Sequence, residues 1–303
     1  MENAYDIAVV GGGPAGLTAA IYARRAGRTV LVLEKETFGG QIASSPLVEN
    51  YPGVPSVSGA ELADRLYTQA DSLGARLELE EVLEIRSEAG RKILRTEYAS
   101  YSCRALILAM GMKHRKLSLP GEDTLKGISW CAVCDGSFYQ GQDVAVCGGG
   151  NTALQDALFL SDLCRSVTLI HRRGEFRGDP VLAEQAGRRP NVTVLLHTVV
   201  TALEGETALR GLRLRQVETG EERALAVTGL FEAVGQVPEG ALSGTVAPVD
   251  DAGFLLAGES CRTSADGVFA AGDCRTKDVR QLTTACADGA VAAVAACRYC
   301  QEF

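Results

Sequence analysis

Gly11-Gly12-Gly13-Pro14-Ala15-Gly16 joins an apolar strand to a helix, and this connection indicates the fold of the chain. The strand is predicted over residues 7–10, the helix over 14–26 and the next strand over 29–34. This is the βαβ unit that binds dinucleotides, in which the glycines let a pyrophosphate approach the helix N-terminus. Glu34 ends the second strand, where a carboxylate binds a ribose 2′-hydroxyl and repels a 2′-phosphate. The alternative is a loop that merely turns the chain, but the complete pattern favours a site for FAD or NAD.

A second glycine-rich loop, Gly148-Gly149-Gly150-Asn151-Thr152-Ala153, lies between a strand predicted over 144–147 and a helix that continues to about residue 163. The strand that follows, at 167–170, ends in basic residues instead of an acid. Guanidinium groups form charge-assisted hydrogen bonds that match a 2′-phosphate. A solvated basic face is the alternative, but the position at a strand end favours NADPH. The basic residues are His171, Arg172, Arg173 and Arg177.

Between the two loops stands Cys131-Ala132-Val133-Cys134-Asp135-Gly136. Two cysteines at this spacing on the first turn of a helix lie close enough for a disulfide, and the helix N-terminus favours a thiolate. Asp135 is placed to give a proton to a departing thiolate. Half of a zinc site is the alternative reading; the nearest second half, Cys297-x-x-Cys300, lies in an Ala-rich helix without turn residues. One dithiol flanked by two nucleotide sites predicts an electron relay.

Composition limits the class of protein. A chain of 303 residues favours two domains, and 46% hydrophobic residues with 34 glycines suit an α/β protein. The formal net charge of −8 argues against nucleic acid as a partner, and the most apolar late segment is too short to span a membrane. The N-terminus reads as a strand and not as a signal peptide, so the ten cysteines predict a reducing, cytoplasmic location.

Other segments fit a flavin site. Residues 39–41 and 49–53 are turn-rich and are expected to line a cofactor. Residues 267–273 form a strand that ends in Gly272-Asp273, and Arg280-Gln281 precede a helix of small residues. A carboxylate at a strand end and a helix N-terminus both suit a flavin, by binding a hydroxyl and by stabilising negative charge on the reduced ring.

Together these motifs resemble the low-molecular-weight, bacterial-type thioredoxin reductases, FAD/NADPH pyridine nucleotide-disulfide oxidoreductases, along essentially the whole chain. The most specific matches are Cys131-Ala132-Val133-Cys134-Asp135-Gly136 and His171-Arg172-Arg173-x-x-Phe176-Arg177. The resemblance implies an α/β fold of two Rossmann-like three-layer domains. Residues 1–113 and 244–303 would form a discontinuous FAD domain, and 114–243 an inserted NADPH domain that carries the cysteine pair. It also implies a homodimer.

Motifs and resemblance together give the expected site residues, with no metal among them. Catalytic roles fall to Cys131, Cys134 and Asp135. Cys134 is expected beside the flavin and Cys131 as the attacking thiol, although the spacing alone allows either order. NADPH contacts are expected at Gly148, Gly150, Asn151, Thr152, Ala153, His171, Arg172, Arg173 and Arg177. FAD contacts are expected at Gly11, Gly13, Pro14, Ala15, Gly16, Glu34, Gly40, Gln41, Asn50, Val82 through its backbone, Gly272, Asp273, Arg280 and Gln281.

The sequence also departs from the family pattern. Met110 replaces the usual threonine between Ala109 and Gly111, and Gln155-Asp156 stand where the helix after the second loop usually carries two glutamates. Cys297 and Cys300 are not a family feature. They lie on one side of a helix and are either packed thiols or a second redox pair.

The predicted function is an NADPH-dependent, FAD-containing reductase that passes electrons from NADPH to FAD, to the Cys131–Cys134 disulfide and then to oxidised thioredoxin or a thioredoxin-fold protein. One rival uses the same chemistry with another acceptor, a peroxidase partner or a small dithiol oxidised by oxygen. A different rival is a redox-sensing module that holds nucleotides without turnover, which the intact cysteine pair and Asp135 argue against. The larger glutathione-reductase type is disfavoured by chain length and by the place of the cysteines.

Overall fold

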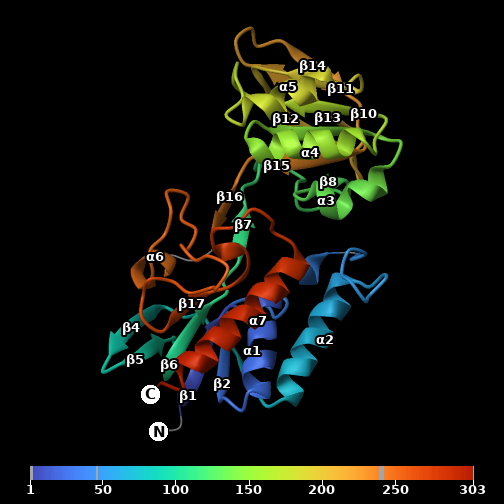
Figure 1. Ribbon diagram of the computed structural model, residues 1–303. Helices are drawn as coiled ribbons and strands as arrows, with labels where there is room; N and C mark the ends of the chain where they lie inside the picture. Colours follow the sequence, from blue (N-terminus) through green and yellow to red (C-terminus); the bar gives the residue numbers. More distant parts are fainter. Residues whose placement is uncertain (1–2, 46, 239–241, 303) are drawn as a thin grey trace. The chain divides into compact units, whose positions relative to one another are not determined.

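The computed structural model describes residues 3–45, 47–238 and 242–302, and these divide into two compact units (Figure 1). Unit 1 comprises Met1–Lys113 and Val237–Phe303, and unit 2 comprises His114–Gln236. The chain passes from unit 2 back to unit 1 at Val237, whereas the sequence predicts a domain boundary at 243/244. At this passage β16 (Gln236–Pro238) pairs with β7 (Met112–His114), and α6 (Ser243–Val246) belongs to unit 1. Residues 239–241 of this connection lie outside the described residues.

Unit 1 is built on one sheet with the strand order β3-β2-β1-β6-β5-β4, and β17 also pairs with β6. The start of β6 pairs with β5 and its end pairs with β17, so this long strand joins a parallel sheet to an antiparallel hairpin. The strands are β1 (Ala4–Val10), β2 (Val30–Glu34), β3 (Arg76–Leu79), β4 (Glu84–Glu88), β5 (Arg91–Arg95), β6 (Ser100–Leu108) and β17 (Val268–Ala270).

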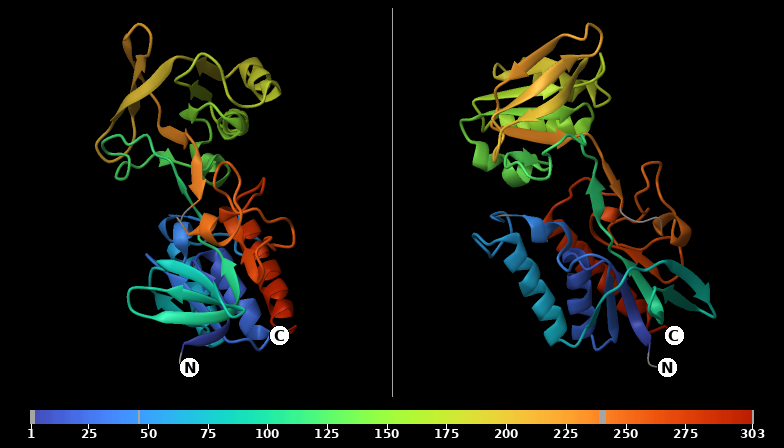
Figure 2. Two further views of the ribbon diagram at one scale, coloured as in Figure 1. Left: turned by 90° about the vertical axis from the view of Figure 1, so that its left-hand side faces the viewer. Right: turned by 180° about the vertical axis from the view of Figure 1, so that it is seen from behind.

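Three helices lie side by side on one face of this sheet: α1 (Pro14–Arg25), α2 (Gly59–Ser72) and α7 (Leu282–Tyr299) (Figures 1 and 2). Helices α1 and α7 approach closely, since a Cβ at Gly289 would stand 2.2 Å from the carbonyl oxygen of Ala15. A second apolar cluster on the other face unites sheet residues with side chains from the β4–β5 hairpin and from residues 242–274. Unit 1 therefore has three layers.

Unit 2 is built on a fully parallel sheet with the order β11-β10-β9-β15-β8. Helices α4 (Asn151–Ser161) and α5 (Pro180–Arg188) cover one face, and a three-stranded antiparallel sheet covers the other. The parallel strands are β8 (Ile128–Ser129), β9 (Asp143–Gly148), β10 (Ser166–Ile170), β11 (Val192–Leu195) and β15 (Gly229–Ala233). The antiparallel strands are β12 (Thr198–Glu204), β13 (Gly211–Gln216) and β14 (Glu222–Leu225).

Two three-layer units, one inserted into the other, confirm the predicted α/β fold class. The glycine-rich loops connect β1 to α1 in unit 1 and β9 to α4 in unit 2, and each helix leads to a parallel neighbouring strand, as the βαβ pattern requires. No helix in the described part of the chain is both long and apolar enough to cross a membrane.

Candidate functional site

The cysteine pair lies on a short turn of unit 2 that follows β8. Cys131 and Cys134 form a disulfide with their Cα atoms 5.3 Å apart, and α3 (Ala132–Asp135) begins between them. Cys131 is the N-cap residue of α3, and its Sγ accepts a hydrogen bond from the backbone N–H of Cys134 at 3.2 Å. Cys134 is exposed whereas Cys131 is half-buried. A donor aimed at Sγ stabilises a thiolate, so the local geometry favours negative charge on Cys131.

Asp135 is fixed by Ser129, a residue that no sequence motif singles out. The Ser129 hydroxyl donates to Oδ2 of Asp135 at 2.6 Å and accepts from the backbone N–H of Cys131 at 3.1 Å. Burial raises the pKa of Asp135, and the bond from Ser129 opposes that rise. A carboxyl with a raised pKa, tied through one hydroxyl to the cysteine turn, is suited to deliver a proton to a departing thiolate.

The first glycine-rich loop forms an open cradle at the N-terminus of α1. Gly11 has a φ of +105°, and a Cβ there would stand 2.3 Å from the carbonyl oxygen of Ala109. At Gly13 the nearest atom to such a Cβ is 4.0 Å away, so space remains beside the helix N-terminus for a pyrophosphate. Glu34 accepts from the backbone N–H groups of Gly12 at 2.7 Å and Glu36 at 2.9 Å, so it also holds the loop.

Four other residues expected to contact FAD have defined surroundings in unit 1. The Asn50 amide donates to Oε1 of Gln281 at 3.2 Å, which brings together two predicted residues that are far apart in sequence. Gln41 lies in a 3₁₀ helix, η1 (Gly40–Ser44), and its amide donates to the carbonyl of Met112. Val82 is buried in the second core cluster of unit 1.

Asp273 supplies the clearest fit to a flavin. It lies in the 3₁₀ turn η3 (Gly272–Cys274), and its Oδ1 is buried without a hydrogen-bond partner among the described residues. Burial raises its pKa, although Lys277 and Arg280 oppose the rise. Arg280 donates to the backbone carbonyl of Asp273 at 3.3 Å, and its guanidinium lies 4.2 Å from the ring centre of Phe254. A buried carboxylate oxygen without a donor suits a hydroxyl of the FAD sugar chain.

Asp288 of α7 is a second supporting residue that lies outside the predicted site. Its Oδ2 accepts from the backbone N–H of Gly272 at 3.0 Å, from Nε of Arg275 at 2.8 Å and from Nζ of Lys277 at 2.9 Å. All three charged side chains are almost fully buried. Asp288 therefore fixes the turn that carries Asp273. A lone acid in an otherwise apolar helix was the signal for it.

The second glycine-rich loop packs directly on His171. A Cβ at Gly149 would stand 2.1 Å from the His171 ring, so only glycine allows this approach. His171 is buried, its Nε2 lies 3.1 Å from the carbonyl oxygen of Glu175, and burial lowers its pKa. A Cβ at Gly150, by contrast, would have no atom within 4 Å, which leaves room at the N-terminus of α4 for phosphate.

The arginines expected to bind the 2′-phosphate are exposed beside this loop. Arg173 and Arg177 line an open hollow with residues 174–176, and the backbone N–H of Arg177 donates to the carbonyl of Gly149 at 2.7 Å. No ion pair engages Arg172, Arg173 or Arg177 within the described residues. Guanidinium groups without a carboxylate partner at a strand end fit a phosphate.

The departures from the family pattern also have structural positions. Burial raises the pKa of Asp156 to about 7, and neighbouring Gln155 is exposed. Cys297 and Cys300 are free thiols buried in the core of unit 1, and burial raises the pKa of both, that of Cys300 to about 11. Thiols with raised pKa values are poor nucleophiles, so the structure favours packed thiols over a second redox pair.

Two nucleotide loops and one cysteine pair define an oxidoreductase that moves electrons between a pyridine nucleotide and a disulfide. The chain belongs to the pyridine nucleotide-disulphide oxidoreductase family, whose model matches residues 5–289. It is 42% identical to the thioredoxin reductase of Mycolicibacterium smegmatis over 305 residues, 99% of this chain and 98% of that one. It is 44% identical to the bifunctional thioredoxin reductase/thioredoxin of Mycobacterium leprae over 306 residues, 99% of this chain and 67% of that protein.

A solved structure agrees with these relatives. The thioredoxin reductase from Streptococcus pyogenes superposes with a TM-score of 0.94 at 36% identity, and the match covers 100% of both chains. The predicted family, the predicted oxidoreductase class and FAD and NADPH as cofactors are thereby confirmed.

Proposed function

We propose that this protein reduces the disulfide of thioredoxin with electrons from NADPH, using Cys131 and Cys134 as the redox pair. The observation that carries the proposal is the cysteine turn: an exposed Cys134, a half-buried Cys131 with a donor on its sulfur, and Asp135 tied to the same turn. Full-length similarity to proteins named thioredoxin reductase supports thioredoxin as the acceptor.

The proposed cofactor-binding roles of the residues follow from their local chemistry. Bound FAD would supply a two-electron carrier between NADPH and the disulfide. Residues of the first loop, Asn50, Gln281 and Asp273 would hold it, and Val82 and Arg280 would complete its site. In the second loop Gly148, Gly150 and the N-terminus of α4 would hold the NADPH pyrophosphate, with the exposed arginines on the 2′-phosphate. Domain roles follow: unit 1 would bind FAD and unit 2 NADPH.

The proposed roles of the two cysteines follow from their surroundings. Cys131 would attack the acceptor, since its sulfur receives the N–H of Cys134 and is therefore stabilised as a thiolate. Asp135 would protonate the thiolate that leaves during exchange. Val133 and Phe138 beside the disulfide are exposed apolar side chains, 54% and 40%, and they offer a docking surface for a protein acceptor.

We also propose a homodimer that forms through α7. Val291 and Val294 are exposed on that helix, 39% and 43%, and lie one turn apart on the same side. An apolar stripe on the outer face of a helix is typical of an interface. A reducing compartment such as the cytoplasm is proposed because every cysteine outside the redox pair is a free thiol.

Acceptor discrimination tests the proposal. NADPH consumption by the purified FAD-loaded protein should be fast with oxidised thioredoxin from the same genome and slow with peroxide or with oxygen and a small dithiol. If the protein reduced a peroxidase partner and not thioredoxin, the proposed acceptor would be wrong, whereas the proposed transfer of electrons from NADPH to a disulfide would stand. Disulfide formation without NADPH would point to the oxidase rival, and no NADPH consumption with any acceptor would favour the nucleotide-holding module.

A further inference from the structure

Two glutamates are buried together in unit 2, beside the cysteine turn but outside the machinery described above. Glu232 is on β15 and is 2% exposed, and Glu122 is in the segment between β7 and β8 and is 4% exposed. The backbone N–H of Leu117 donates to the Glu232 carboxyl and that of Leu119, two residues further on, donates to the Glu122 carboxyl, so one short segment holds both groups, and the interaction with Glu122 contributes to the raised pKa of Glu232. No cation forms an ion pair with either one in the part of the chain that the structure describes. Buried carboxyl groups that interact without a counter-ion cannot both be ionised at ordinary cost.

The hydrogen bonds around the pair leave a place for one proton. Oε2 of Glu232 accepts from the backbone N–H of Leu117 and from Nε1 of Trp130, both at 3.2 Å. Oε2 of Glu122 accepts from the backbone N–H of Leu119 at 2.9 Å. The two Oε1 atoms are buried and have no donor among the described residues. A proton carried by one Oε1 and donated to the other satisfies both atoms.

Trp130 connects this pair to the redox turn. It directly precedes Cys131, and the residue before it, Ser129, pairs with Phe231 of β15 and donates to Asp135. The indole N–H is held by Glu232, the neighbour of Phe231 on the same strand. The position of Trp130 therefore sets the start of the cysteine turn and the support of its proton donor.

We propose that Glu122 and Glu232 share one proton and act as positioning residues that hold Trp130, so that loss of the proton loosens the cysteine turn and slows disulfide exchange. The part about exchange rests on the proposed function. When both carboxyls ionise, repulsion between the like charges separates the 117–122 segment from β15, and the hydrogen bond from the backbone N–H of Leu117 to Glu232 is lost. Trp130 then loses its acceptor and becomes exposed to water.

The pH of this change follows from the surroundings of the pair. Burial, then the interaction with Glu122, raises the pKa of Glu232 to about 8. The other groups around the site titrate elsewhere: burial lowers the pKa of His114, the bond to Asp123 raises that of Lys116, and burial raises that of Cys147, opposite Glu232 on β9, to about 12. Loss of the shared proton is therefore expected near pH 8.

Trp130 is the only tryptophan of the chain, so its fluorescence reports on the site directly. The oxidised, FAD-loaded protein is the right sample, because the Cys131–Cys134 disulfide has no thiol to titrate. Its tryptophan emission should shift to longer wavelength as the pH rises through about 8. Glu232→Gln should keep the emission of the low-pH state at every pH, because an amide donates to Glu122 and accepts from the indole without a titrating proton.

Matched variants complete the test. Glu122→Gln should abolish the shift in the same way, which keeps the test valid if Glu232→Gln does not fold, and Glu221→Gln, an exposed turn residue of unit 2, should leave it unchanged. Glu232→Ala should show the long-wavelength emission at all pH values and a roughly tenfold to hundredfold lower rate of acceptor reduction. A shift that persists in both Gln variants, or no shift in the unmodified protein, would overturn the proton-sharing pair. The fluorescence result does not depend on turnover, so failure of the proposed function would be recognised separately.

Discussion

At the scale of single residues, the difference between the two nucleotide sites lies in the side chains that end the second strand of each βαβ unit. Glu34 ends β2 and bonds the backbone of its own loop. The strand β10 is followed by His171, which is buried beneath the second loop, and by exposed arginines. A carboxylate at one site and guanidinium groups at the other favour different nucleotides at the 2′ position.

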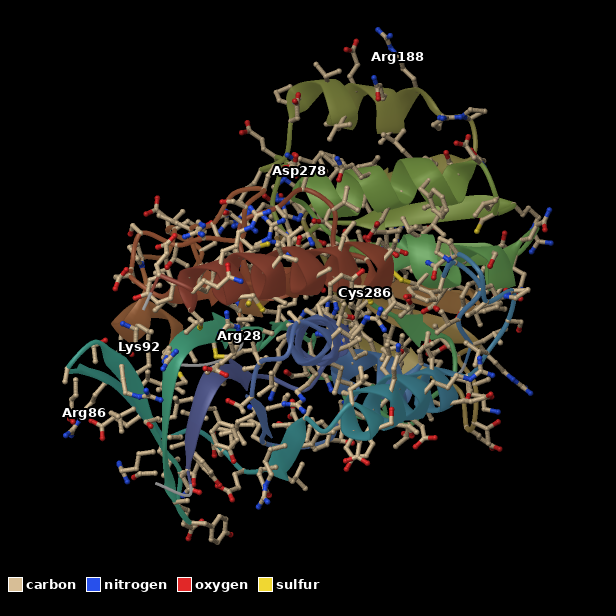
Figure 3. All side chains as sticks on the ribbon, turned by 60° about the horizontal axis from the view of Figure 1, so that its bottom comes forward. Arg28, Arg86, Lys92, Arg188, Asp278 and Cys286 are labelled. Carbon is tan, nitrogen blue, oxygen red and sulfur yellow. A yellow bond between two sulfur atoms is a disulfide. The ribbon has the colours of Figure 1, made fainter. Side chains whose placement is uncertain are left out.

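Replacement of Arg172 and Arg173 by Ala should therefore remove the preference for NADPH over NADH. Each lost charge-assisted contact is expected to lower kcat/KM for NADPH roughly tenfold to a hundredfold, with little effect on NADH. Arg188→Ala is the matched control, because Arg188 is an exposed arginine of unit 2 at the end of α5 (Figure 3). Equal use of both coenzymes by the unmodified protein would contradict the assignment.

Asp135 gives a second test at this scale. Asp135→Asn should slow reduction of the acceptor by roughly a hundredfold or more, because a general acid is lost, and should leave the bleaching of flavin absorbance by NADPH unchanged. Since burial raises the pKa of Asp135, the unmodified protein should also lose acceptor reduction as the carboxyl ionises above its ordinary pKa. This decrease in the rate of acceptor reduction at higher pH should be absent from Asp135→Asn. An unchanged acceptor rate in Asp135→Asn would remove this residue from the mechanism.

At the scale of elements, helix α7 does more than cover the sheet. Its buried Asp288 binds Gly272, Arg275 and Lys277, and so fixes the turn that presents Asp273. Burial raises the pKa of Asp288, but the bonds with Arg275 and Lys277 outweigh it and hold the pKa below its ordinary value. The stabilisation from this ion cluster is therefore present above that ordinary value and is lost as the pH falls through the lowered pKa.

Asp288→Asn should lower the free energy of unfolding by about 3–5 kcal/mol, because it leaves buried cations without their partner. It should also weaken FAD retention, measured by release of flavin on dilution. Asp278→Asn is the control, since Asp278 is an exposed acid just before the same helix (Figure 3). If both variants unfold at the same temperature and retain FAD equally, the turn does not depend on α7.

The elements that could be predicted from sequence are those with a complete local pattern. Helix α2 begins directly after Ser58, since Ser58-Gly59-Ala60-Glu61 has the pattern of a capping box, and the Ser58 side chain accepts from the backbone N–H of Glu61 at 3.2 Å. Helix α5 was not predicted, although Asp179 caps it and Pro180 opens it, because it has few apolar residues and only Ala186 is fully buried. β12 was also missed, because the sheet that it completes depends on pairing with β13, which a local pattern does not reveal.

The residues of the candidate site also divide into those with a local sequence pattern and those that depend on contacts made by folding. Loop glycines, the cysteine pair and the strand-end charges could be predicted, because their chemistry is tied to sequence spacing. Ser129 and the Glu122–Glu232 pair could not, since each acts through a contact that only folding creates. Asp288 is marked in the sequence only as a lone acid in an apolar helix, and its partners Gly272, Arg275 and Lys277 are known only from the fold. The pairing of β7 with β16, where the chain passes between the two compact units, also has no distinctive sequence pattern.

At the scale of the whole molecule, one continuous segment forms a unit with its own core. His114–Gln236 contains two apolar clusters, one on each face of its parallel sheet, whereas unit 1 is assembled from two distant segments. A fragment of residues 114–236 should therefore fold alone, with a cooperative thermal transition, and should bind 2′-phospho-ADP-ribose more tightly than ADP-ribose. A fragment that stays unfolded, or that binds both ligands equally, would count against an independent NADPH unit.

Delivery of electrons from NADPH to Cys131 and Cys134 is tested most directly by differential alkylation and mass spectrometry of the FAD-loaded protein without oxygen. NADPH alone should convert the disulfide to two alkylatable thiols, and added oxidised thioredoxin should return the pair to a disulfide while its own thiols appear. The buried thiols Cys297 and Cys300 should keep the same labelling throughout. A Cys131–Cys134 disulfide that stays intact while NADPH bleaches the flavin absorbance would contradict the assignment of this pair as the redox centre.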